Sequence, residues 1–125
     1  MIIKKIIFIL CICISNSVYA KEYIIGFGSC IDQKLPQPIW KAIEDKNIDG
    51  FMFLGDNVYG DDPSGDLNKL KNSYIRQYTK LPQWLNQKKI ISIWDDHDYG
   101  KNDGGGDYKN KKRVSKIIFG FLENS

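Results

Sequence analysis

Two apolar segments of strand length each run directly into a group of acidic residues, and this pattern restricts the possible folds strongly. Residues 50–54 (GFMFL) lead into Gly55 and Asp56, and residues 90–94 (IISIW) lead into the acidic cluster at residues 95–98 (DDHD). Continuous apolar segments of this length are typical of strands in a parallel sheet. The carboxyl ends of parallel strands meet at one edge of the sheet. The sequence therefore predicts acidic side chains gathered at one edge, although a solvated acidic turn also fits residues 95–98 taken alone.

The remaining elements complete an α/β pattern. Residues 23–27 (YIIGF) predict a first strand, and residues 39–46 a short amphipathic helix after a proline-containing loop. Apolar residues recur every three or four positions from 66 to 81, which predicts a longer helix with Asp66 as its N-cap. A further helix is expected at residues 114–122. The predicted order is β-α-β-α-β, with parallel strands and connecting helices.

The first 20 residues have the features of a secretory signal peptide. Lys4 and Lys5 precede an unbroken apolar run at residues 6–14, and Val18-Tyr19-Ala20 supplies small residues before a cleavage site. Nine apolar residues are too few to cross a membrane, because a span needs about 20. We therefore expect cleavage after Ala20, a periplasmic or secreted protein, and no membrane span in the mature chain. Residues 21–125 would form about one small domain.

Charge and its distribution exclude one class of function and favour another. Loss of Lys4 and Lys5 lowers the net charge from +3 to +1, so the sequence predicts no nucleic-acid-binding patch. Nine of the 15 acidic residues lie in the loops after the second and third predicted strands. One cysteine, Cys30, remains after the first strand, where it is either a small buried apolar residue or a ligand. Carboxylates, the imidazole of His97 and a thiolate together suit a hard cation beside a softer transition metal. A calcium loop of the EF-hand type at residues 61–66 lacks the required ligand spacing.

Three short motifs resemble one enzyme family. These are Gly28-Ser29-Cys30, Gly55-Asp56-Asn57-Val58-Tyr59, and Trp94-Asp95-Asp96-His97-Asp98-Tyr99-Gly100 followed by Asn102-Asp103. In this order, each after a predicted strand, they resemble the alkaline phosphatase D (PhoD-type) family of metallophosphatases. The resemblance implies that residues 21–125 are the N-terminal half of an αββα sandwich. The β-α-β-α-β core would then be incomplete.

The resemblance also implies roles for individual residues. Cys30 and Tyr59 would bind Fe(3+), and Asp56 would bridge that iron and a neighbouring Ca(2+). Asp96 would be a further metal ligand, and His97 would face the phosphate and protonate the leaving oxygen. Such enzymes hydrolyse phosphate monoesters and diesters outside the cytoplasm, through a hydroxide that the bound metal activates.

Asn102 and Asp103 are the predicted substrate-binding residues, and the substrate would be a phosphoester, either a small molecule or a polymer. Two other functions stay open at this point. The chain contains one histidine, and members of the family are much longer, so it is either an active phosphoesterase or an inactive fragment that binds metal or phosphate. A truncated product that folds poorly is the third interpretation. We expect the two central helices to cover one face of the sheet and part of the other.

Overall fold

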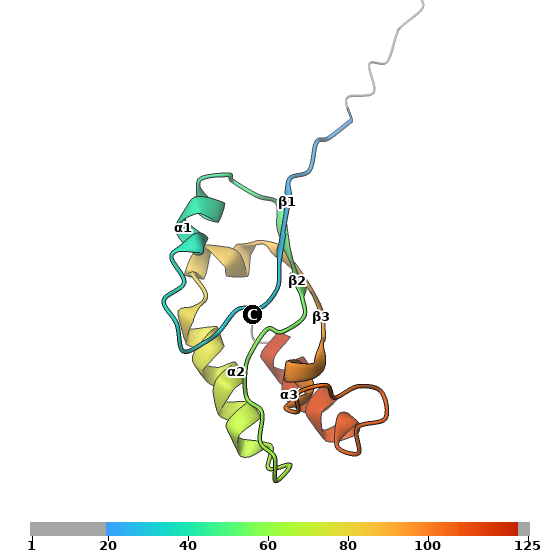
Figure 1. Cartoon of the computed structure of the whole chain (residues 1–125). Coiled ribbons are helices and arrows are strands. Elements are labelled where there is room, and N and C mark those ends of the chain that lie inside the picture. The colour runs from blue at the N-terminus through green and yellow to red at the C-terminus, as the bar shows by residue number, and fades with distance from the viewer. Residues whose placement is uncertain (1–19, 123–125) are drawn as a thin grey trace, which may run out of the picture.

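The computed structural model describes residues 20–122 and has an α/β architecture (Figure 1). The predicted signal segment, residues 1–20, lies outside the described residues apart from Ala20. No helix in the described part of the chain is long and apolar enough to cross a membrane. The elements in chain order are β1 Ile25–Gly28, α1 Ile39–Glu44, β2 Gly50–Leu54, α2 Asn68–Lys80, η1 Gln83–Gln87, β3 Lys89–Ile93, η2 Asp96–Tyr99 and α3 Lys111–Leu122, where η1 and η2 are 3₁₀ helices.

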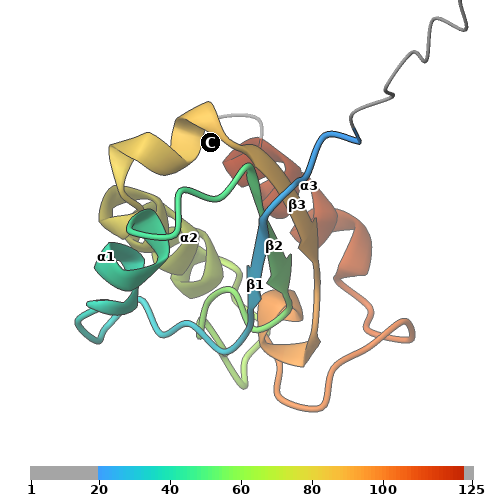
Figure 2. The same ribbon diagram turned by 90° about the horizontal axis from the view of Figure 1, so that it is seen from above.

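The sheet has three parallel strands in the order β1-β2-β3, which confirms the predicted parallel arrangement. Both crossovers advance in the same direction across the sheet. Because such crossovers are right-handed, they place their helices on the same face. Figure 2 shows α1 and α2 on one side of the sheet, and α3 contacts α2 and η2. The αββα sandwich is a larger arrangement than this small sheet and stays a prediction.

Aromatic side chains fill the space between the covered face and α1. Phe51 and Phe53 of β2 point toward Trp40 of α1, and the Trp40 and Phe51 rings lie 5.2 Å apart in an edge-to-face arrangement. On β1 the facing position is Gly26, where an added Cβ would lie 2.8 Å from the Phe51 ring. Leu85 of η1 is also buried in this core. The glycine at position 26 thus makes room for the large ring on the neighbouring strand.

A second core lies between α2 and α3. Leu70 and Tyr74 of α2 pack with Val114 and Ile118 of α3, and all four side chains are buried. The third helix begins at Lys111, three residues before its predicted start. Its basic first turn is solvated, because Val114 is the first of its residues to reach the core.

Several element boundaries differ from the prediction by one to three residues, and those of β1 and α2 have a clear description. The first strand begins at Ile25 rather than residue 23, since pairing with β2 starts at the Ile25–Gly50 pair. Asp66 is not the N-cap of α2. The helix begins at Asn68, and the Asp66 carboxylate accepts a hydrogen bond from the Asn68 N–H at 3.0 Å. Leu67 holds the cap position; its backbone is already helical and its side chain is buried in the α2–α3 core.

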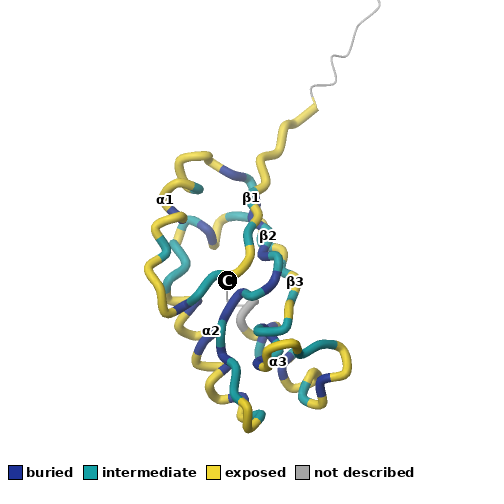
Figure 3. The backbone as a smooth tube through the Cα atoms, viewed as in Figure 1, coloured by how far each residue is buried: buried dark blue, intermediate teal, exposed yellow. Residues whose placement is uncertain are grey.

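The other face of the sheet carries apolar side chains that no described helix covers. Alternation along the paired strands places six of them there, and both edge strands carry exposed residues (Figure 3). Phe27 is 72% exposed, Ile93 53% and Ile91 46%. The expectation that α1 and α2 would cover part of this face is wrong, because both crossovers wind the same way. We call this surface the bare sheet face; it consists of Ile25, Phe27, Met52, Leu54, Ile91 and Ile93.

Candidate metal centre

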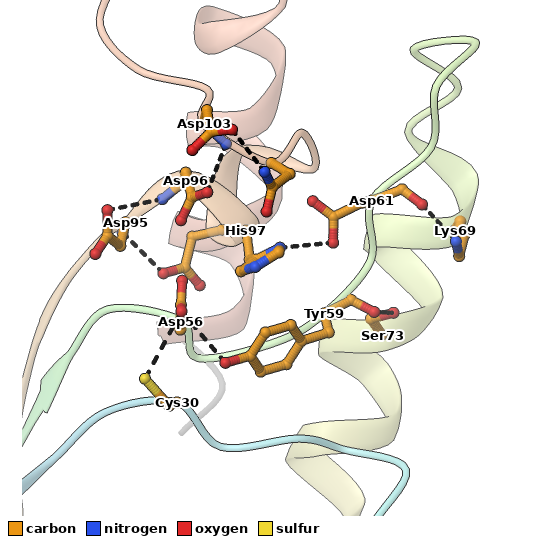
Figure 4. A network of polar contacts seen from close by, with 12 residues as sticks. Cys30, Asp56, Tyr59, Asp61, Lys69, Ser73, Asp95, Asp96, His97 and Asp103 are labelled. Atoms are coloured by element: carbon orange, nitrogen blue, oxygen red, sulfur yellow. Dashed lines mark hydrogen bonds and ion pairs between the residues drawn. The ribbon is translucent and has the colours of Figure 1, made fainter.

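The loops that follow β2 and β3 bring three metal-binding side chains together at the carboxyl end of the sheet. Asp56 follows β2, and Asp96 and His97 belong to η2, directly after β3. One ligand atom from each of these three residues lies within 4.8 Å of the others (Figure 4). The prediction that the two acidic loops meet at one edge is therefore confirmed for these residues. A carboxylate pair beside an imidazole is a donor set that suits a divalent or trivalent cation.

Cys30 and Tyr59 both contact the same oxygen of Asp56. The Cys30 thiol is 3.7 Å from Asp56 Oδ2, and the Tyr59 hydroxyl donates to that oxygen at 3.2 Å. The other carboxylate oxygen, Asp56 Oδ1, is buried and has no hydrogen-bond partner among the described residues. Cys30 is exposed, so its interpretation as a buried apolar residue is wrong. A buried carboxylate oxygen without a donor is expensive unless a cation occupies the space beside it.

The backbone at this edge adopts unusual conformations. Cys30 has a φ of 59° and Asp56 a φ of 50°, in the left-handed region that residues other than glycine rarely adopt. Gly55 has a φ of 95°, and a Cβ there would lie 2.7 Å from Asp95 Cβ. Hydrogen bonds from Cys30 N to Gly55 O and from Ile31 N to Asp56 O fix the first loop against the second. Such conformations persist where the surrounding structure holds them, and they concentrate at functional sites.

Asp61 is the hydrogen-bond partner of His97. The two residues are joined at 2.8 Å between His97 Nδ1 and Asp61 Oδ2, and the imidazole packs against the Tyr59 ring at 4.5 Å between centroids. Burial lowers the pKa of His97, but Asp61 and the carboxylates of Asp96 and Asp56 outweigh it, and the net shift is upward. No sequence signal distinguishes Asp61 from the other acidic residues of the two strand-end loops.

Asp98 is fully buried and ties the two acidic loops to α2. Its carboxylate accepts hydrogen bonds from the backbone N–H groups of Asn57 and Asp95, both at 3.0 Å, and from the Tyr74 hydroxyl at 2.7 Å. Burial raises the pKa of Asp98, although these hydrogen bonds act in the opposite direction. Asp95 caps η2 at the same time, through a capping box with Asp98. Asp98 is therefore a structural residue that sequence reasoning missed.

Asp103 holds Asp96 through its backbone. The Asp103 N–H donates to Asp96 Oδ2 at 2.6 Å, and this hydrogen bond lowers the pKa of the Asp96 carboxyl. The Asn102 side-chain amide donates to Asp103 Oδ2 at 2.7 Å. Asn102 and Asp103 line a hollow of about 630 Å³ that Asp61 also lines. Their role in substrate binding stays a prediction, and the arrangement adds a positioning role for the Asp103 backbone.

Gln33 fixes the backbone of Tyr59. The Gln33 side chain is buried, donates to Tyr59 O at 2.9 Å and accepts from Tyr59 N at 2.9 Å. Burial raises the pKa of the Tyr59 hydroxyl well above its usual range, and the contact with Cys30 adds to this. The phenol is therefore neutral in the absence of a cation, and only a strongly acidic metal ion would deprotonate it. No sequence signal singles out Gln33, because glutamine is mostly a surface residue.

Comparison with family models, curated proteins and solved structures gives no match for this chain. Its function is therefore argued from the chemistry of the centre itself.

Proposed function

We propose that this chain contributes a metal-dependent phosphoesterase centre that acts outside the cytoplasm, of the kind found in PhoD-type enzymes. One observation carries the proposal: Asp56, Asp96 and His97 converge at the carboxyl end of a parallel sheet, directly beside Cys30 and Tyr59. Carboxylate, imidazole, thiol and phenol groups rarely meet at one point for structural reasons alone. The substrate class is a phosphate monoester or diester.

The donor set fits two cations of different character. Cys30 and Tyr59 would hold Fe(3+) together with Asp56, since thiolate and phenolate ligands are formed by a strongly Lewis-acidic ion. Asp56 and Asp96 would hold Ca(2+), which prefers carboxylate oxygens. The buried Asp56 Oδ1 without a donor supports a cation on that side of the carboxylate. When bound, the ions would supply Lewis acidity toward water and the phosphoryl oxygens.

His97 is placed to move a proton in this reaction. Its Nδ1 is occupied by Asp61, which leaves Nε2 to face the substrate. The upward shift of the His97 pKa favours the protonated ring, whose Nε2–H can donate to the leaving oxygen. General-acid assistance of this kind contributes about 10²–10⁴-fold in rate. Asp61 orients the ring and stabilises its positive charge.

A second candidate is a metal- or phosphate-binding fragment without turnover. Apart from His97, whose proposed role is proton transfer, the described residues provide four ligand side chains at this edge, and two metal ions together need more ligands than that.

Metal content and turnover separate these candidates. The chain from Lys21 is loaded with iron and calcium, desalted, analysed for bound metal, and assayed with bis-p-nitrophenyl phosphate. Asp56→Asn tests the centre, and Asp45→Asn is the matched control, because Asp45 is an exposed carboxylate outside both the metal-binding group and the hollow that Asn102 and Asp103 line. Metal binding with turnover, both lost in Asp56→Asn only, supports the enzyme. Metal binding without turnover supports the fragment, and no difference between the two variants in metal content refutes both.

A further inference from the structure

Helices α2 and α3 enclose a groove that is separate from the metal centre. It has a volume of about 630 Å³ and is lined mainly by apolar atoms. Ile75 and Tyr78 of α2 face Ile117 of α3 across it, and Ile75 is 54% exposed. Lys71 and Lys116 line the same groove. An apolar channel between two lysines is suited to a ligand that has both an apolar and an anionic part.

A smaller hollow of about 420 Å³ continues this groove toward the start of both helices. It shares Lys71 and Lys116 with the groove and adds Arg113, while Asp66 is its one carboxylate. The Asp66 carboxylate is engaged by the backbone and side chain of Asn68. Within residues 20–122, none of the three cations forms an ion pair. Three positive charges therefore line this hollow against the single negative charge of Asp66, which leaves an excess of positive charge.

The charge pattern of the two helices extends this local picture. Between them, Asn68–Lys80 and Lys111–Leu122 contain eight lysine and arginine residues and no aspartate or glutamate. The acidic residues of the chain lie mostly in the strand-end loops instead. A helical surface with cations around exposed apolar side chains is the composition of proteins that bind at the interface of anionic membranes.

We infer that the α2–α3 groove docks this protein onto an anionic lipid surface. The phosphate of a lipid headgroup lies among Lys71, Arg113 and Lys116, and the adjoining acyl region contacts Ile75 and Ile117. A free inorganic anion would use the cations alone, and an uncharged apolar ligand would use the channel alone. A membrane lipid with an anionic phosphodiester headgroup uses both. This inference does not depend on the proposed phosphoesterase centre.

Vesicle binding tests the inference directly. The chain from Lys21 is used, because the apolar run of residues 6–14 would itself enter vesicles, and EDTA is present so that no metal at Asp56 binds headgroups. Vesicles of phosphatidylcholine with about one-third phosphatidylglycerol should bind the protein, and pure phosphatidylcholine vesicles should bind it far less. Each basic residue at an anionic surface contributes about fivefold in affinity. The triple variant Lys71→Gln, Arg113→Gln, Lys116→Gln should therefore bind roughly a hundredfold more weakly.

A matched control removes the same charge elsewhere. Lys34→Gln, Lys46→Gln, Lys89→Gln alters three exposed lysines outside the groove and should change affinity by no more than about twofold at physiological salt. Ile75→Ser should weaken binding with the charges intact.

Three results would overturn the inference. One is an equal loss in both triple variants, which would show attraction by net charge only. The others are full competition by inorganic phosphate, which would show a site for the free anion, and an absence of binding to the anionic vesicles. Circular dichroism identifies any groove variant that has lost its fold. In that case the double variant Lys71→Arg, Lys116→Arg, which keeps both charges, replaces it, and loss of vesicle binding in this double variant would also overturn the inference.

Discussion

Replacement of the buried carboxylate of Asp98 should destabilise the protein although no atom larger than the original is introduced. In Asp98→Asn, one side-chain oxygen can still accept from Asn57 N and the Tyr74 hydroxyl, which both contact Asp98 Oδ1 in the native protein. The second oxygen becomes an NH₂ group that faces the donor Asp95 N. That N–H loses its acceptor and meets another donor.

The expected cost follows from the number of donors that lose their acceptor. The Asn57 side-chain amide also donates to Asp98 Oδ2, but it keeps Ser92 Oγ and Ile93 O as partners. One part-buried N–H is thus left unsatisfied, and the remaining hydrogen bonds lose their charge. A donor left without a partner costs about 1–3 kcal/mol. The neutral amide also accepts weaker hydrogen bonds than the carboxylate, but this loss is partly offset because a buried charge no longer has to be desolvated. We expect a loss of about 2 kcal/mol, or roughly 10 °C in Tm for a domain of this size.

Urea unfolding followed by tryptophan fluorescence, with EDTA present, measures this loss. Asp107→Asn is the control, since it makes the same chemical change at an exposed loop position and should alter stability by less than about 0.5 kcal/mol. Tyr74→Phe should cost about 1–2 kcal/mol and should be less than additive with Asp98→Asn, because the two residues share one hydrogen bond. Equal stability of Asp98→Asn and the control would refute the argument that this carboxylate ties the loops to α2.

Four further predictions concern the centre, the leader and the sheet. The pKa of His97 is raised in the folded protein. The pair with Asp61 therefore stabilises the metal-free fold fully below a pH of about 6.5, and this stabilisation is lost as pH rises through the folded pKa. Asp61→Asn should flatten that part of the curve of stability against pH. The iron-loaded protein should be coloured by tyrosinate-to-iron charge transfer, and a visible band that survives Tyr59→Phe would contradict the proposed ligand. N-terminal sequencing of exported protein should show cleavage after Ala20, and an intact N-terminus on membrane-bound protein would contradict it. The protein should self-associate, and Phe27→Ser should shift its sedimentation toward the monomer if the bare sheet face is responsible.

The sequence was sufficient to predict those features that depend on local pattern. The apolar segments before Asp56 and Asp96 predicted parallel strands. The parallel arrangement is enough to place the loops that follow these strands at the same edge of the sheet. The partner of His97 could not be predicted in this way, because Asp61 lies 36 residues away and many loop carboxylates were equivalent in the sequence. Asp98 was also indistinguishable from its neighbours, since its burial depends on the Tyr74 hydroxyl of α2, 24 residues earlier.

Helix boundaries and sheet coverage depended on tertiary packing that periodicity does not describe. The predicted N-cap at Asp66 is wrong by one residue, although the Asp66 carboxylate accepts a hydrogen bond from the first turn of α2. Which face of the sheet the helices cover depends on the handedness of the crossovers and on the strand order. Strand order cannot be predicted from the sequence of any single strand.

The bare sheet face also determines how association through it depends on temperature. Apolar surface in contact with water carries a large heat capacity, which is lost when another surface covers it. Any partner that covers Phe27 and Ile91, whether a second copy or further polypeptide, should therefore bind with a negative change in heat capacity. Its affinity should fall on cooling, because the hydrophobic contribution weakens at low temperature. Calorimetry of association at several temperatures would then test for contact through this face.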